Sequence, residues 1–163
     1  MCALRILCSL LQGLLHKGGL GGHSLVRIGL DVGKVRIGVA VCDELGLVAS
    51  PHTVIRSKGW GNDIARLVEL VSEVGAGEIV VGLPVNMNGT RGPAAARVEE
   101  FCHRLSESVS VPVVTWDERL STAQASRVLI EADLSRKRRR DVIDKTAAAI
   151  ILQAYLDNLA SRR

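Results

Sequence analysis

Acidic residues at separated positions of the chain are the side chains best suited to chemistry. The first, Asp31, ends an apolar segment and stands between two glycines, Gly29 and Gly33. A carboxylate in such a setting is costly to bury unless it is paired or binds a cation. Alternatively, Asp31 accepts hydrogen bonds from the amides of a strand–turn–strand hairpin. This segment alone leaves both interpretations open.

Two adjacent acids, Asp117 and Glu118, directly follow a second apolar segment, residues 111–116. Because successive side chains of a strand point to opposite faces, one of the two can face a site while the other pairs elsewhere. Their alternative role is to favour the positive end of a following helix. Ser121, however, already suits the position that caps that helix.

Asp144 belongs to the last helical segment. It shares a helical stripe with Ala148, Ile151 and Tyr155, so its carboxylate lies on a face that otherwise belongs to the core. An aspartate near a helix start usually caps the helix, but Asp141 is better placed for that task.

Together these acids form a set. Strand ends in α/β sheets are where ligands bind, and converging carboxylates repel one another unless divalent cations lie between them. Oxygen ligands favour Mg²⁺ or Mn²⁺ over zinc. We therefore expect Asp31, Asp144 and one of the two acids Asp117 and Glu118 to be catalytic residues that bind Mg²⁺ or Mn²⁺.

Polar and cationic residues elsewhere could contact phosphate groups. The loop 82–92 follows a strand, and its backbone amides could hold a phosphate, although it could equally be a plain connection. The run 136–140 consists of five consecutive cations, which could follow a phosphate backbone or be solvated surface. A weaker basic and aromatic loop contains Arg56, Lys58 and Trp60. The predicted substrate-binding residues are Arg36, Asn86, Arg91, Arg119, Arg136, Lys137, Arg138, Arg139 and Arg140.

The elements that must position these residues follow from the apolar periodicity. Segments 25–30, 37–41 and 47–55 predict three antiparallel strands, with a turn at 43–46. Helical spacing near 64–71 and 98–105 alternates with short strands at 78–83 and 111–116, and a further helix covers 121–132. The basic run precedes a last helix from about 141 to 160. This order predicts one α/β domain over 25–160, with a mixed sheet of three antiparallel and two parallel strands flanked by helices. Residues 1–24 are expected to form a poorly ordered extension.

Composition narrows the class of protein. The formal charge of +4 is mildly favourable for a polyanionic partner, whereas the four aromatic residues argue against reading of unpaired bases. The four cysteines lack the spacing of a zinc site or a disulfide framework, which favours a reducing, cytoplasmic location. The apolar segment 2–15 is too short and interrupted for a membrane span.

Four motifs occur in one order: G-L-D-V-G-K-V-R-I-G-V-A from Gly29, G-L-P-V-N-M-N-G from Gly82, D-E-R-L-S-T from Asp117 and D-x-x-A-A from Asp144. With them the chain resembles the YqgF family, also called RuvX, over residues 25–159. These RNase H-like proteins are described as Holliday junction resolvases or pre-16S rRNA nucleases. The resemblance implies an RNase H-like fold and an acidic metal-binding triad at Asp31, Glu118 and Asp144.

The implied activity is metal-dependent phosphodiester hydrolysis by a two-metal mechanism, in 5′-end processing of pre-16S rRNA during ribosome biogenesis. The first alternative is a Holliday junction resolvase-like DNA endonuclease of recombination and repair, whose paired cuts would favour a homodimer. Two others are a non-catalytic nucleic-acid-binding or transcription-associated protein, and a nucleotide-binding module of the actin and sugar-kinase type. The expected partner is a structured RNA precursor or branched DNA, with no membrane.

Overall fold

The computed structural model describes residues 26–86, 88–118 and 136–162. Its elements are β1 (Arg27–Val32), β2 (Arg36–Cys42), β3 (Ala49–Arg56), α2 (Trp60–Val74), β4 (Glu78–Leu83), α3 (Pro93–Ser108), β5 (Val113–Asp117) and α5 (Arg136–Ser161). The predicted extension 1–24 and the predicted helix 121–132 lie outside the described residues. None of the described helices is long and apolar enough to cross a bilayer.

One five-stranded sheet, in the order β3-β2-β1-β4-β5, carries the fold. β1, β2 and β3 pair antiparallel, and β4 and β5 are added parallel to β1. The predicted mixed sheet of three antiparallel and two parallel strands is therefore confirmed. Because β1, β4 and β5 run in the same direction, their carboxyl ends meet at one end of the sheet, together with the start of β2 and the end of β3.

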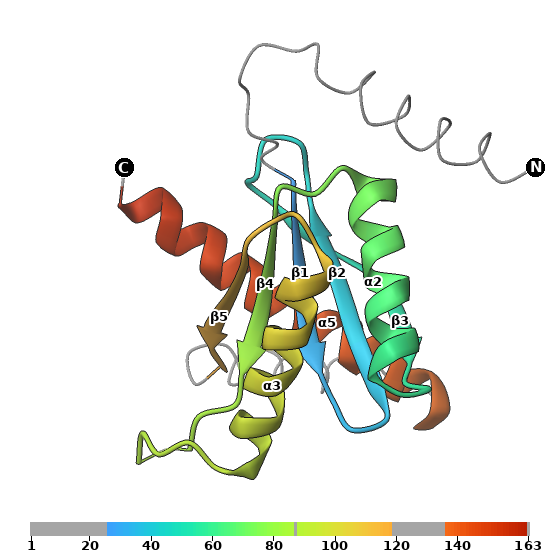
Figure 1. Cartoon of the computed structure of the whole chain (residues 1–163). Coiled ribbons are helices and arrows are strands. Elements are labelled where there is room, and N and C mark those ends of the chain that lie inside the picture. Colours follow the sequence, from blue (N-terminus) through green and yellow to red (C-terminus); the bar gives the residue numbers. More distant parts are fainter. Residues whose placement is uncertain (1–25, 87, 119–135, 163) are drawn as a thin grey trace, which may run out of the picture.

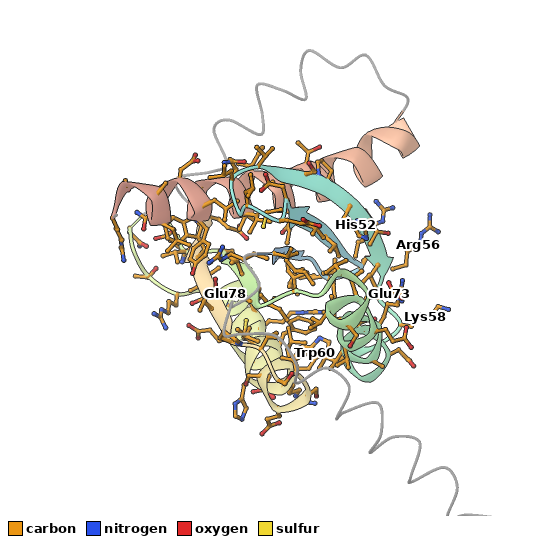
Figure 2. The ribbon with its side chains drawn as sticks, turned by 90° about the horizontal axis from the view of Figure 1, so that it is seen from above. His52, Arg56, Lys58, Trp60, Glu73 and Glu78 are labelled. Carbon is orange, nitrogen blue, oxygen red and sulfur yellow. The ribbon has the colours of Figure 1, made fainter. Side chains whose placement is uncertain are left out.

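Helices cover both faces of the sheet. α2 and α3 lie on one face and α5 crosses the other, as the two views show (Figures 1 and 2). The core is accordingly divided in two by the sheet. Ile28, Leu30 and Val81 pack toward α2 and α3, whereas Val80 packs toward Leu152 of α5.

Local sequence explains most helix and turn boundaries. Pro93 occupies the first turn of α3, where its missing N–H does no harm. Gly75 ends α2 in the left-handed conformation, with φ of 63°, and its N–H bonds to the carbonyl oxygen of Val71. The predicted turn at 43–46 is confirmed, because the N–H of Gly46 donates to the carbonyl oxygen of Asp43 at 3.0 Å.

The last helix differs from the sequence prediction. α5 begins at Arg136, so the basic run forms the first turns of the helix rather than preceding it, and Asp141 lies inside the helix rather than at its cap. The reason is that Arg and Lys are good helix formers and that no Gly or Pro interrupts the segment. β3 also begins at Ala49 rather than at residue 47, because the amides of Leu47 and Val48 donate to the carboxylate of Asp43 in the preceding turn.

Candidate active site

The carboxyl end of the sheet brings Asp31 and Glu118 together on the α5 face. Asp31 is the fifth residue of β1, and the neighbouring residue Leu30 packs into the opposite core. On β5, Val114 and Trp116 pack toward α5, so strand alternation turns Asp117 to the α2–α3 face. Glu118 follows at the strand end and lies against Gly82 of β4.

Glycine at position 82 makes room for the Glu118 carboxylate. A Cβ atom added to Gly82 would collide with the Oε1 atom of Glu118 and would lie 2.6 Å from Cδ1 of Ile151. The carboxylate therefore lies in a narrow space between β4 and α5 that any larger residue would fill. This contact gives Gly82 a role in the site that the sequence alone does not show, because there Gly82 is only the first residue of a loop and of a family motif.

Burial and neighbouring charge act together on Glu118. Removal from water raises the pKa of its carboxyl to about 7, and the negative charges of Asp31 and Asp117 add to the rise. Asp31 is therefore close enough to Glu118 for its negative charge to affect the pKa of the Glu118 carboxyl. A carboxylate held in this way is stabilised by an incoming cation, because the cation removes the repulsion.

Asp144 belongs to α5, the helix that covers this face of the sheet. It lies one helical turn before Ala148, whose carbonyl oxygen would be 2.8 Å from a Cβ atom added to Gly29 of β1. Glycine is required there because the helix backbone approaches the strand too closely for a methyl group. The side chain of Asp144 lies outside the described residues.

The donor set fits a hard divalent cation. Both described carboxylates of the α5 face supply oxygen, the ligand type that Mg²⁺ and Mn²⁺ prefer. Among the residues that the structure describes, no three His, Cys, Asp or Glu side chains gather closely enough to hold a metal by themselves. The side chain of Asp144, the third acid expected from the sequence, is not among those residues.

The residues predicted to contact phosphate groups are spread over several elements, unlike the acids. Arg91 pairs with Glu99 of α3 at 2.5 Å, and the amide of Asn86 donates to Oγ1 of Thr90 at 2.9 Å, so both side chains are engaged near the 84–92 loop. Arg36 begins β2, next to the site end of β1. Arg119 lies outside the described residues, and so do the side chains of residues 136–140, although their backbone belongs to α5.

Comparison of the fold with solved structures defines its class. A Thermus thermophilus RuvC in complex with Holliday junction substrate matches with a TM-score of 0.53 at 15% identity, over 83% of this chain and 95% of that one. The fowlpox virus Holliday junction resolvase matches with a TM-score of 0.50 at 13% identity, over 82% and 99% of the two chains. The fold is that of the RNase H-like resolvases, and the predicted fold class is confirmed.

Sequence comparison is more specific. The profile described as "RuvX: Holliday junction resolvase" matches residues 25–158, and the chain belongs to this family. Proteins named "Putative pre-16S rRNA nuclease" are similar to it: that of Syntrophomonas wolfei is 53% identical over 80% of this chain and 92% of its own length. The protein of that name from Symbiobacterium thermophilum is 56% identical, over 82% of this chain and 93% of its own. The resemblance to the YqgF or RuvX family is thereby confirmed, and the family is one of nucleases.

Proposed function

We propose that this protein is a metal-dependent nuclease that hydrolyses phosphodiester bonds in the 5′-end processing of pre-16S rRNA. The carrying observation is the pair of carboxylates, Asp31 and Glu118, from β1 and the end of β5, that meet on one face of the sheet close enough to raise the pKa of Glu118. The names of the relatives support the RNA substrate.

Asp31, Glu118 and Asp144 would hold two Mg²⁺ or Mn²⁺ ions. Such ions, when bound, supply activation of a water molecule and stabilisation of the leaving oxygen. The protein contributes positioning. Strand pairing fixes Asp31, the narrow space above Gly82 fixes the Glu118 carboxylate, and the close contact of α5 with Gly29 fixes the helix that carries Asp144.

Asp117 has a different task in this proposal. Strand alternation directs it to the α2–α3 face, so it does not join Glu118 as a ligand. Its charge nevertheless contributes to the raised pKa of Glu118. Asp117 therefore adds to the negative potential of the site without contacting the ions.

A parallel cleavage assay tests the activity. Purified protein with Mg²⁺ or Mn²⁺ is given a structured pre-16S rRNA fragment, duplex DNA and a four-way DNA junction. We expect metal-dependent cleavage of the RNA that EDTA abolishes. Absence of cleavage of all three substrates with either metal would overturn the proposal.

A second candidate is a DNA resolvase. The description of the family profile favours it, since it names a Holliday junction resolvase. Resolution of a four-way junction needs two symmetric cuts and hence a dimer. Preferential, paired cleavage of the junction, together with a dimeric mass in solution, would select this candidate over RNA processing.

A further inference from the structure

A basic groove lies at the same end of the sheet as the candidate active site, on the side of α2, where β3 ends and α2 begins. Its volume is about 320 Å³, and it is lined by Ile55, Arg56, Lys58, Asn62, Asp63 and Arg66. Figure 2 shows Arg56 and Lys58 at the open edge of the sheet, directed away from the body of the protein. Both side chains are exposed.

The cations of this groove are not equally neutralised. Arg66 is paired with Glu69 at 3.0 Å and with Glu73 at 2.9 Å along α2. In the described part of the chain, Arg56 and Lys58 have no carboxylate within ion-pair distance. Positive charge therefore remains uncompensated at the mouth of the groove.

A third cation, Arg36, lies on β2, between the strand that ends at Arg56 and the strand that carries Asp31. Arg36 and Arg56 are direct partners across β2 and β3, and like charges in directly opposed positions destabilise a sheet. Arg36 is two residues from Gly38, the partner of Asp31, so it lies on the same face as Asp31. An anion that approaches this end of β2 and β3 would therefore meet two neighbouring arginines.

The segment that carries Lys58 is held in place by a buried acid. Asp63, only 2% exposed, accepts hydrogen bonds from the Ser57 hydroxyl at 2.6 Å and the Lys58 amide at 3.0 Å. The Ser57 amide in turn donates to the carbonyl oxygen of Val35, in the turn that links β1 to β2, at 2.9 Å. The groove is thus fastened to the same turn that follows Asp31.

The aromatic residue next to the groove does not offer a stacking surface. The ring of Trp60 has the guanidinium of Arg104 over it at 4.8 Å and meets Phe101 edge to face at 6.2 Å. We therefore expect this groove to bind nucleic acid through charge, by contacts to phosphate groups, rather than through stacking of bases on Trp60.

We propose that Arg36, Arg56 and Lys58 form a phosphate track that binds the backbone of a duplex segment of the nucleic-acid substrate, beside the bond to be cut. The choice of nucleic acid as partner rests on the proposed function. Two strand spacings separate β1 from β3, about 10 Å in total. That span equals the axial rise of roughly three base pairs of a duplex, at about 3.4 Å each.

Salt dependence of binding tests the track separately from cleavage. Binding of a labelled duplex DNA and of a structured RNA hairpin is measured in EDTA, so that no metal-dependent cut occurs. Against the wild type, the slope of log affinity with log salt should fall by about 0.9 for Arg56→Gln and about twice that for the double variant Arg56→Gln/Lys58→Gln on duplex DNA. The charge-conserving variant Arg56→Lys/Lys58→Arg should keep the wild-type slope.

Arg162→Gln is the matched control. It removes the same charge from an exposed arginine directly after α5. Figure 1 shows the C-terminal end of α5 on the opposite side of the molecule from the start of α2. Its slope should equal that of the wild type. Unfolding temperatures of all variants confirm that the exposed substitutions leave the fold intact.

The possible outcomes distinguish a failure of the phosphate track from a failure of the proposed nuclease activity. An unchanged slope in the double variant, or a wild type that binds neither probe, would overturn the track whatever the cleavage assay shows. A reduced slope with no cleavage by the wild type would support the track while refuting the proposed function. Where cleavage occurs, the double variant should raise KM several-fold and leave kcat unchanged.

Discussion

The two halves of one sheet end differ in charge and in how their side chains are held. At the ends of β1, β4 and β5, carboxylates from distant segments are brought together in a confined space, and burial acts on their charge. At the end of β3 and in the loop that follows, the side chains of Arg56 and Lys58 are exposed, and neither has a carboxylate within ion-pair distance in the described part of the chain. The confined half suits chemistry, and the open half suits binding.

This difference implies different sensitivities to substitution. A charge in a confined, poorly solvated space interacts strongly with its neighbours, whereas an exposed charge is screened by water and salt. Changes at the acidic half should therefore alter the rate of cleavage and the stability of the fold. Changes at the basic half should alter affinity alone, in a salt-dependent way.

The largest effect is expected from Asp31→Asn. Loss of one carboxylate ligand should reduce cleavage about a thousand-fold, equivalent to about 4 kcal/mol of activation free energy, while binding of nucleic acid in EDTA stays within about two-fold. Single-turnover cleavage rates and the same binding assay measure the two quantities. Asp117→Asn, which lies on the other face, is the control and should cost less than about ten-fold. Full activity in Asp31→Asn would refute the assignment of the site.

Gly82→Ala should come next. The added methyl group collides with the Glu118 carboxylate and with Ile151, so we expect a loss of about 1–3 kcal/mol of unfolding free energy and a fall in cleavage of at least about ten-fold. Chemical denaturation and cleavage rates measure both effects.

Gly61→Ala provides a matched control within α2. A Cβ atom there meets nothing within 4 Å, and replacement of a helical glycine by alanine stabilises by roughly 0.5–1 kcal/mol. If both variants changed stability in the same direction, the contact at Gly82 would not be the cause of the loss.

Asp63→Ala tests whether Asp63 holds the loop that carries Lys58 in place for binding. Removal of a buried acceptor of two hydrogen bonds should lower the free energy of unfolding by about 1–3 kcal/mol. The salt slope of binding should fall as well, because Lys58 is no longer held. Denaturation and the binding assay test this pair of effects. A destabilised variant with an unchanged salt slope would show that Asp63 supports the fold but not the track.

The smallest effect is a pH-dependent gain of stability in Glu118→Gln. The pKa of Glu118 in the folded state, about 7, lies above its ordinary value, so the folded state holds the proton more tightly than the unfolded state. Wild-type stability therefore falls as pH rises from about 4.5 to about 7. Glutamine has no such dependence. In EDTA above pH 7 the variant should be more stable by about 1–2 kcal/mol, after allowance for solvent screening of a partly buried group.

Denaturation of both proteins in EDTA at pH 5 and pH 8 measures this difference. A gain that is equal at the two pH values would mean that charge repulsion at Glu118 is not its source. Addition of Mg²⁺ at pH 8 should narrow the gap, because bound cations stabilise the wild type.

The sequence was sufficient for the sheet and for the positions of the strand acids. Apolar runs of strand length, ended by Asp31 and by the pair Asp117 and Glu118, predicted where chemistry could lie. The choice between Asp117 and Glu118 could not be made in that way. It depends on which face of β5 packs against α5 and on the space above Gly82, and both are properties of tertiary packing.

The basic groove could not be predicted from the sequence either, because it too depends on tertiary packing. The sequence presents Arg56 and Lys58 as a weak basic loop, but no local pattern shows that Arg56 is paired with Arg36 across the sheet. The role of Asp63 could not be predicted from the sequence either, because acidic residues are common in the first turn of a helix. Its burial and its bonds to Ser57 and Lys58 come from the way α2 docks onto the end of β3.

The close approach of α5 to Gly29 has a consequence for how the protein is made. β1 can be covered on that face only after α5 has been synthesised, so until then this face of the strand stays open to water and to other chains. Contacts between such distant segments are slow to form. Because β1 carries Asp31 and α5 carries Asp144, the acids that we propose as metal ligands can come together only after α5 has docked on the sheet.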